Sequence, residues 1–237
     1  MKYIITSGPM VMEIDSVRNI KNSSTGKLGA IFAETLVAKT AAEVVYIHTA
    51  GAILPTVEVN AIEIKNHEQL IAALTQELTA DSVVIHAMAI SDFKYGGSVD
   101  IERLAQTIFE NLATFTCADA VKTIIKDSVR TSSKLASNSD QLLLLNQADK
   151  IIDKIKTICP QARLVGFKLL SNVDKQELIN VAVNMKQRAG CDLVVANLKE
   201  QVHGGEHHAY IISDTTIREA HTKEQIATMV IEEMEQI

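Results

Sequence analysis

Short runs rich in valine, isoleucine and leucine alternate with helical patterns along almost the whole chain. The strand runs are mostly continuous rather than alternating, which is typical of strands that are covered on both faces. We expect strands at Tyr3–Thr6, Val44–His48, Val57–Ile64, Ser82–His86, Gln141–Leu145, Leu164–Leu169, Leu193–Ala196 and Ala209–Ser213, and helices at Lys27–Lys39, His67–Leu78, Ile101–Leu112, Asp149–Ile158, Asp174–Arg188 and Thr222–Glu235. This order predicts an α/β fold: one doubly wound, mostly parallel, Rossmann-like sheet with helices on both faces and a mobile flap insertion.

Length, charge and cysteine content limit the possible partners and location. The 237 residues fit one nucleotide-binding domain over 1–237, with the flap or insertion at about 94–140, where the regular alternation is lost. A net charge of −6 without a basic run disfavours nucleic acid as a partner, and no apolar run nears the roughly 20 residues of a membrane span. Three widely spaced cysteines and the lack of a secretory signal favour a cytoplasmic protein without disulfides.

The most informative segment is Asp15–Gly29, which lies between the first strand and the first helix. It combines small hydroxyl residues and two glycines with three cations. A polar loop that leads from a strand into a helix builds an anion site, because unpaired N–H groups and the positive end of the helix dipole meet a phosphate. The alternative is a loop that is well capped by Ser23, Ser24 or Thr25 and holds no ligand.

Two common phosphate-binding fingerprints do not fit this segment. Lys21 and Leu28 occupy the first glycine and the hydroxyl position of a Walker loop, and Gly26–Gly29 matches only part of the dinucleotide pattern. The second strand ends at Thr49 without an acidic residue for a ribose diol, so an NAD-linked reductase is disfavoured. In the histidine-rich run His203–His208, two glycines interrupt the spacing of a zinc pair, and a loop is favoured over a metal site.

Two further features suggest contact with a ligand, and each has an ordinary structural alternative. Asp92 follows a buried strand, at the edge of an α/β sheet where ligands bind, although a turn aspartate would look the same. The hydroxyl-rich run Arg130–Asp140 with its two cations suits a flap that closes on phosphates, or a solvated linker.

Taken together, these motifs resemble the phosphopantothenate–cysteine ligase family in its free-standing bacterial form. The segment Ile14–Gly29 is similar to the family's first loop, and Ala89–Phe93 is similar to its Ala-Val-x-Asp-Tyr/Phe segment. Lys134–Leu142 looks like the family flap, and Val165–Lys168 and Val195–Asn197 fit later segments in the same order. The resemblance therefore covers nearly the whole chain, with the first loop as its most specific part.

The resemblance implies a ligase of coenzyme A biosynthesis that joins 4′-phosphopantothenate to L-cysteine. The pantothenate carboxylate attacks the α-phosphorus of CTP, and the cysteine amine then displaces CMP from the acyl-cytidylate. It further implies Mg²⁺ on the triphosphate and a homodimer. The implied catalytic residues are Asn22 and Lys134, and the implied binding residues are Arg18, Ser24, Gly26, Ala89, Asp92, Phe167, Lys168 and Asn197. This set includes no metal ligand.

One departure from the family pattern favours an alternative function. Where the family has Gly-Gly-Thr, this chain reads Gly8-Pro9-Met10. Proline fixes φ and removes a backbone donor, and Met10 replaces a hydroxyl. The alternative is a diverged, non-catalytic nucleotide-binding relative of the family.

Overall fold

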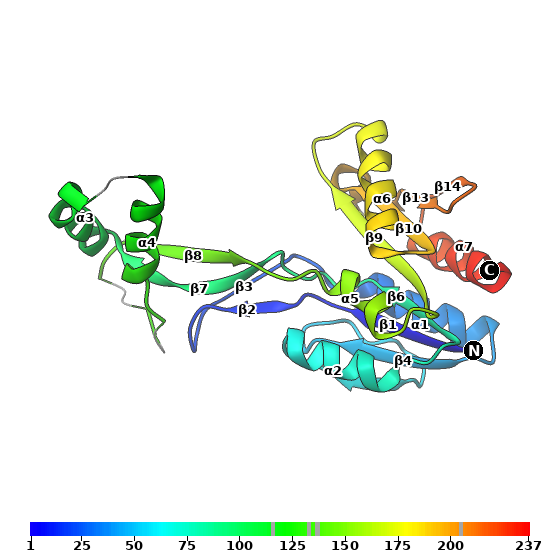
Figure 1. The fold of residues 1–237 in the computed structure, drawn as a ribbon. Helices are drawn as coiled ribbons and strands as arrows, with labels where there is room; N and C mark the ends of the chain where they lie inside the picture. The colour runs from blue at the N-terminus through cyan, green and yellow to red at the C-terminus, as the bar shows by residue number, and fades with distance from the viewer. Residues whose placement is uncertain (115–116, 132–133, 136–137, 204–205) are drawn as a thin grey trace. The chain divides into compact units, whose positions relative to one another are not determined.

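The computed structural model describes residues 1–237 except 115–116, 132–133, 136–137 and 204–205. The chain divides into two compact units (elements labelled in Figure 1). Unit 1 comprises 1–10, 23–90 and 150–237, and unit 2 comprises 11–22 and 91–149. No helix in the described part of the chain is long and apolar enough to cross a membrane.

Unit 1 is built on an eight-stranded sheet with the strand order β14-β13-β10-β9-β6-β1-β4-β5. Its strands are β1 (Lys2–Ser7), β4 (Glu43–His48), β5 (Asn60–Glu63), β6 (Ser82–His86), β9 (Arg163–Leu170), β10 (Leu193–Leu198), β13 (Ala209–Ile212) and β14 (Ile217–Ala220). All neighbouring pairs from β5 to β10 are parallel, and only β13 and β14 run antiparallel to their neighbours. The predicted Rossmann-like, mostly parallel α/β sheet is confirmed.

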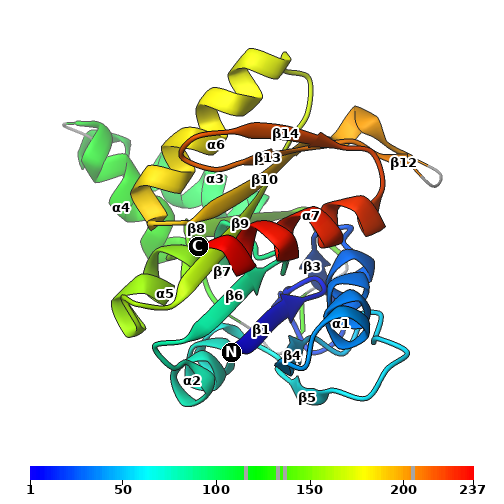
Figure 2. The ribbon, with the colours of Figure 1, turned by 90° about the vertical axis from the view of Figure 1, so that its right-hand side faces the viewer.

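Helices cover both faces of this sheet, as continuous apolar strands require. These helices are α1 (Lys27–Lys39), α2 (His67–Glu77), α5 (Ile151–Ile158), α6 (Lys175–Ala189) and α7 (Lys223–Gln236), with a short 3₁₀ helix η2 (Lys199–Gln201). Side chains of α2, α5 and α6 join one core cluster, and those of α1 and α7 join the other. Figure 2 shows α1 and α7 together on one side of the strands. Successive residues of β1 alternate between the clusters, with Ile4 in one and Tyr3 and Ile5 in the other.

Helix starts follow the local capping signals that the sequence carries. Asn66 accepts a hydrogen bond from the backbone N–H of Gln69 at 2.9 Å, and Thr222 accepts one from Gln225 at 3.1 Å. These caps satisfy backbone donors that the first turn of a helix leaves without partners. The predicted helix bounds therefore agree with the structure to within one or two residues.

The described part of unit 2 holds two antiparallel strand pairs, two α-helices and a 3₁₀ helix. Its elements are β2 (Val11–Glu13), β3 (Asn19–Lys21), β7 (Phe93–Asp100), α3 (Ile101–Glu110), the 3₁₀ helix η1 (Leu112–Thr114), α4 (Ala118–Ser128) and β8 (Gln141–Gln147). β2 pairs with β3, and β7 pairs with β8. A small further hairpin, β11 (Val202–His203) with β12 (Glu206–His207), belongs to unit 1.

Three sequence expectations about strands are corrected. Gln141–Leu145 is not a strand of the main sheet but the start of β8, whose partner is β7. The expected strand Val57–Ile64 is shorter, as β5, and the expected loop Asp15–Gly29 contains the strand β3. An apolar run shows that a strand forms but not which strand it pairs with, because pairing is decided by distant residues.

Candidate functional site

The start of α1 is the structural centre of the Asp15–Gly29 segment. Gly26 is the N-cap, with φ 76°, a left-handed conformation that favours glycine. The Ser24 hydroxyl accepts a hydrogen bond from the Gly26 N–H at 3.4 Å, and the Thr25 hydroxyl accepts one from the Lys27 N–H at 3.3 Å. In the alternative considered for this loop, Ser23, Ser24 or Thr25 caps the helix, but the N-cap is Gly26. A glycine N-cap has no side chain to bind the N–H groups of Leu28 and Gly29, which lack intrahelical acceptors.

Ser7, the last residue of β1, holds this helix start against the sheet. Its hydroxyl donates to the carbonyl of Gly26 at 3.0 Å and accepts from the phenol of Tyr46 at 2.8 Å. A Cβ on Gly26 would lie 2.9 Å from Ser7 Oγ, and one on Gly29 would lie 2.4 Å from it. Both glycines are thus required by the close approach of α1 to the carboxyl end of β1, the edge where α/β sheets bind ligands.

Thr49, which follows β4, is a residue at this edge that the sequence interpretation missed. Its hydroxyl is buried and has no hydrogen-bond partner in the described part of the chain. It lies over Gly8 (φ 90°), where an added Cβ would meet the Thr49 hydroxyl and the Ala52 methyl, each at 2.6 Å. Buried hydroxyls are normally paired, so this unused donor and acceptor marks the edge as a site for a polar ligand. Its only sequence signal was its position after a buried strand.

Ala89 lies beside the Gly8-Pro9-Met10 segment and explains why proline is tolerated there. The Ala89 N–H donates to the Gly8 carbonyl, and the Met10 N–H donates to the Ala89 carbonyl, both at 3.0 Å. This parallel bridge uses no donor of Pro9, so the missing N–H breaks no hydrogen bond of the bridge. The Met10 side chain is buried in the core.

His86 fixes the segment that leads to Ala89. The Thr6 hydroxyl lies 2.8 Å from His86 Nδ1 and accepts a hydrogen bond from the Met88 N–H at 3.4 Å. With its one hydrogen, the hydroxyl donates to the imidazole nitrogen. Burial lowers the pKa of His86 to about 4, so the imidazole is neutral and can accept this bond.

Phe167, Lys168 and Asn197 lie on the neighbouring strands β9 and β10, toward their carboxyl ends. In the register Lys168 faces Ala196, and Asn197 faces Leu169. The Phe167 ring packs edge-to-face on Phe32 of α1, with ring centroids 5.9 Å apart. Phe167 therefore supports the α1 face of the core.

The other four predicted site residues belong to unit 2. Arg18 is in the loop between β2 and β3, and Asn22 directly follows β3. Asp92 precedes β7, and its carbonyl accepts the Ala148 N–H at 2.8 Å. Lys134 is exposed and precedes the buried Leu135. Residues 132–133 and 136–137 of the expected flap lie outside the described residues.

Asp15 connects the β2–β3 loop to the segment that carries Lys134. Its carboxylate accepts hydrogen bonds from the backbone N–H groups of Val17 (2.9 Å), Arg18 (2.7 Å) and Leu135 (3.0 Å), and forms an ion pair with the Arg18 guanidinium at 3.0 Å. These interactions, led by the Leu135 N–H, lower the pKa of Asp15 to about 2. Asp15 was part of the recognised motif but was not predicted as a site residue.

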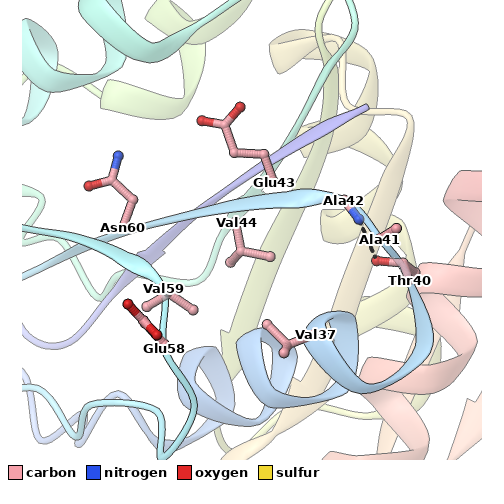
Figure 3. Close-up of a pocket in the computed structure, with 9 residues that line it drawn as sticks. All are labelled: Val37, Thr40, Ala41, Ala42, Glu43, Val44, Glu58, Val59 and Asn60. Atoms are coloured by element: carbon pink, nitrogen blue, oxygen red, sulfur yellow. Dashed lines mark hydrogen bonds between the residues drawn. The ribbon is translucent and has the colours of Figure 1, made fainter.

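A separate surface hollow of about 580 Å³ lies in unit 1 (Figure 3). It is lined by residues of the α1–β4 turn and the amino ends of β4 and β5, with Glu43 and Glu58 as its charged groups. This is the opposite edge of the sheet from Ser7 and Thr49, and two carboxylates suit no phosphate. The hollow is therefore not the candidate site.

The sheet and the glycine-lined helix start at its carboxyl edge define a Rossmann-like α/β protein with the geometry of an anion site. A family model described as the DNA/pantothenate metabolism flavoprotein C-terminal domain matches residues 1–106. Residues 1–106 are thus similar to that family, which agrees with the resemblance drawn from the motifs.

Relatives extend this similarity over the whole chain. The coenzyme A biosynthesis bifunctional protein CoaBC is 29% identical over 240 residues in Thermococcus kodakarensis and 26% identical over 244 residues in Methanocaldococcus jannaschii. Both matches cover 100% of this chain and 51% of the relative, so the chain spans about half the length of these relatives.

Solved structures give the same fold. The crystal structure of the DNA/pantothenate metabolism flavoprotein from Streptococcus pneumoniae matches with a TM-score of 0.84 and 29% identity, covering 100% of this chain and 99% of that one. The C-terminal domain of CoaBC has a TM-score of 0.64 at 17% identity, covering 99% and 94% of the two chains, and supports the fold alone.

Proposed function

We propose that this chain is a phosphopantothenate–cysteine ligase of coenzyme A biosynthesis that uses CTP. The observation that carries the proposal is the start of α1, where Gly26 and Gly29 lie against Ser7 at the carboxyl edge of β1. This arrangement offers backbone N–H groups to a phosphate at the place where the family motif stands. The relationship to CoaBC over the full chain supports the same activity.

The proposed reaction has two steps. The carboxylate of 4′-phosphopantothenate attacks the α-phosphorus of CTP, and pyrophosphate leaves. The amine of L-cysteine then attacks the acyl carbon of the acyl-cytidylate, loses a proton, and CMP leaves. The first step is needed because a free carboxylate has no adequate leaving group. Catalysis then consists mostly of positioning and of stabilising negative charge.

Each predicted residue has a role in this proposal. Ser24 and Gly26 bind phosphate at the start of α1, and Arg18 and Lys168 supply positive charge for anionic groups. Asn22 donates amide N–H groups to the oxygens of the acyl-cytidylate. Lys134 neutralises the α-phosphate as the carboxylate attacks. The remaining binding residues, assigned to the nucleotide and its acyl adduct, are Ala89, Asp92, Phe167 and Asn197.

The donor set at the helix start fits a magnesium ion that arrives on the nucleotide. No group of three Asp, Glu, His or Cys side chains gathers there among the described residues, so the protein offers no ready-made cage. Mg²⁺ usually keeps several waters and binds through substrate phosphates, and here the phosphate oxygens held at Ser24 and Gly26 would carry it. Such an ion would supply additional charge neutralisation for the triphosphate.

The proposal includes a cytoplasmic homodimer. Unit 2 exposes three leucines of one strand, β8, with Leu142 44%, Leu143 38% and Leu145 40% exposed. Large exposed apolar side chains close together are typical of protein interfaces. Three widely spaced cysteines, odd in number, fit a reducing compartment.

A pyrophosphate-release assay with CTP or ATP tests the function. We expect release from CTP once 4′-phosphopantothenate is added, and CMP release only when L-cysteine follows. An Asn22→Asp variant should fail in the first step or accumulate the intermediate, because a carboxylate would repel the anionic adduct. Pyrophosphate release equal to background with both nucleotides would refute the ligase. A rise in melting temperature with CTP but no turnover would indicate the diverged, non-catalytic relative instead.

A further inference from the structure

The antiparallel pair β13–β14 brings two histidines and a glutamate to one face of the sheet edge. Ala209 pairs with Ala220, and Tyr210 pairs with Glu219. The same register, continued by one residue, places His208 opposite His221. Because side chains alternate between faces along a strand, His208, Glu219 and His221 share one face. Figure 2 shows the two strands side by side.

The potential ligand atoms of these three residues converge. One such atom from each residue lies within 4.8 Å of the others. His208 Nε2 is 3.1 Å from Glu219 Oε2. The rings of His208 and His221 are stacked, with centroids 4.8 Å apart and an interplanar angle of 11°. Two imidazoles and a carboxylate form a common ligand set of zinc and related divalent transition metals.

Neighbouring residues orient the three side chains. His208 Nδ1 lies 3.1 Å from Gln201 Oε1, so an N–H on Nδ1 leaves the lone pair of Nε2 directed at Glu219. The Lys175 ammonium binds Glu219 Oε1 at 2.8 Å, which leaves Oε2 for a ligand. Metal-ligating histidines and carboxylates commonly have such outer partners.

The two ring nitrogens of His208 face oxygens on opposite sides, Nδ1 toward Gln201 Oε1 and Nε2 toward Glu219 Oε2, each at 3.1 Å. An ion bound by His208 Nε2 and Glu219 Oε2 would lie beside the stacked ring of His221, so the three side chains suit one shared ion.

We propose that His208, Glu219 and His221 bind a divalent transition-metal ion, with zinc as the natural probe and a fourth position open to water. The site is independent of the proposed ligase reaction. It differs from the zinc pair considered in the run His203–His208, because only the last residue of that run takes part. A bound ion would join β13 to β14 at the sheet edge and, through Gln201, restrain η2.

Zinc titration of metal-stripped protein by calorimetry tests the site, with Co²⁺ absorption as a second probe of coordination. We expect one ion per chain in the wild type and a melting temperature that rises with zinc. His221→Ala and Glu219→Gln should each weaken binding at least about tenfold and abolish the thermal shift. The matched control is His203→Ala, since His203 is another histidine of the same region, 71% exposed and outside the ligand set.

The outcomes decide whether these three residues hold an ion. Binding that is lost in His221→Ala and kept in His203→Ala supports the metal, provided that circular dichroism shows both variants folded. No zinc binding by the wild type would overturn the proposal. Equal zinc affinity in all variants would also overturn it, because the ion would then bind elsewhere.

Discussion

The carboxylate of Asp15 accepts a hydrogen bond from the backbone N–H of Leu135, 120 residues further along the chain, at 3.0 Å. The guanidinium of Arg18 lies 3.5 Å from the carbonyl of the same residue. Both polar groups of Leu135 are therefore held by the β2–β3 loop. Lys134, the proposed catalytic lysine, is thus fixed through its neighbour, and the ligase motif and the flap motif meet within unit 2.

Replacing Asp15 with alanine should release the segment that contains Lys134 and Leu135. The variant loses an ionised acceptor of three backbone N–H groups, so we expect the Leu135 amide to exchange about tenfold faster or more. CTP-dependent pyrophosphate release should fall, because Lys134 is no longer held. Hydrogen exchange followed by mass spectrometry and the release assay measure the two effects.

The control for this variant is Asp119→Ala in α4. Asp119 is also an aspartate of unit 2, but it is 84% exposed and forms an ion pair with Lys122 of the same helix. Its loss should leave Leu135 exchange and pyrophosphate release unchanged. Unchanged exchange in Asp15→Ala would show that other contacts hold the segment.

Replacing Lys134 with alanine should impair chemistry without unfolding the protein. The side chain is exposed, so little packing is lost, whereas removal of a charge that stabilises the transition state typically costs about 10²–10³-fold in rate. Single-turnover pyrophosphate release measures the effect, and circular dichroism checks the fold. Lys126→Ala, an exposed lysine of α4, is the control; equal rates in the two variants would remove Lys134 from the mechanism.

Replacing Gly26 with alanine should destabilise unit 1 and weaken nucleotide binding. Its φ of 76° and the approach of a Cβ to Ser7 Oγ at 2.9 Å predict a loss of about 1–2 kcal/mol. Urea unfolding and the thermal shift with CTP measure these effects. Gly51→Ala is the matched control because a Cβ there meets no atom within 4 Å, and we expect a change within about 0.5 kcal/mol. Similar losses at both glycines would contradict the close-approach argument.

Stability should fall as the pH is lowered from about 6.5 to about 4. Burial lowers the pKa of His86 and of His207 to about 4. Between these pH values the unfolded chain binds protons that the native state excludes. Each histidine therefore lowers the free energy of unfolding by up to about 1.4 kcal/mol per pH unit. Above pH 6.5 neither histidine lowers the free energy of unfolding. Urea unfolding at several pH values measures the slope of the free energy of unfolding against pH. This slope should be smaller in His86→Gln and unchanged in the exposed control His203→Gln.

The strand–helix alternation predicted the core of unit 1 well. Most strands of the main sheet and all five α-helices of this unit were predicted to within a few residues, and some begin at a local signal such as the Asn66 cap of α2. Propensity, periodicity and capping act within a few residues, so a sequence shows them. The leucine run of β8 was assigned to the wrong sheet. Several of its leucines are partly exposed in the two-stranded pair with β7, and a continuous apolar run alone does not distinguish this from a central strand.

The predicted site residues are present in both units, but two informative residues were missed. The Thr49 hydroxyl is informative because it is buried without a hydrogen-bond partner among the described residues. The Asp15 carboxylate is informative because it accepts a hydrogen bond from the distant Leu135 N–H. Neither property can be read from neighbouring residues. The β13–β14 cluster was missed for the same reason, since Glu219 and His221 become ligand candidates only through the register that brings them to His208.

The sequence by itself determined the class of fold, the helix bounds and the family motif, because these depend on side-chain periodicity, capping and short segments. The tertiary structure decided how Pro9 is accommodated, why Gly26 and Gly29 must be glycine, and which residue holds the segment beside Lys134. These properties arise from contacts between residues that are distant in the chain. Their partners are fixed only when the strands pair and the helices pack, since pairing register and close approach are properties of the folded chain as a whole.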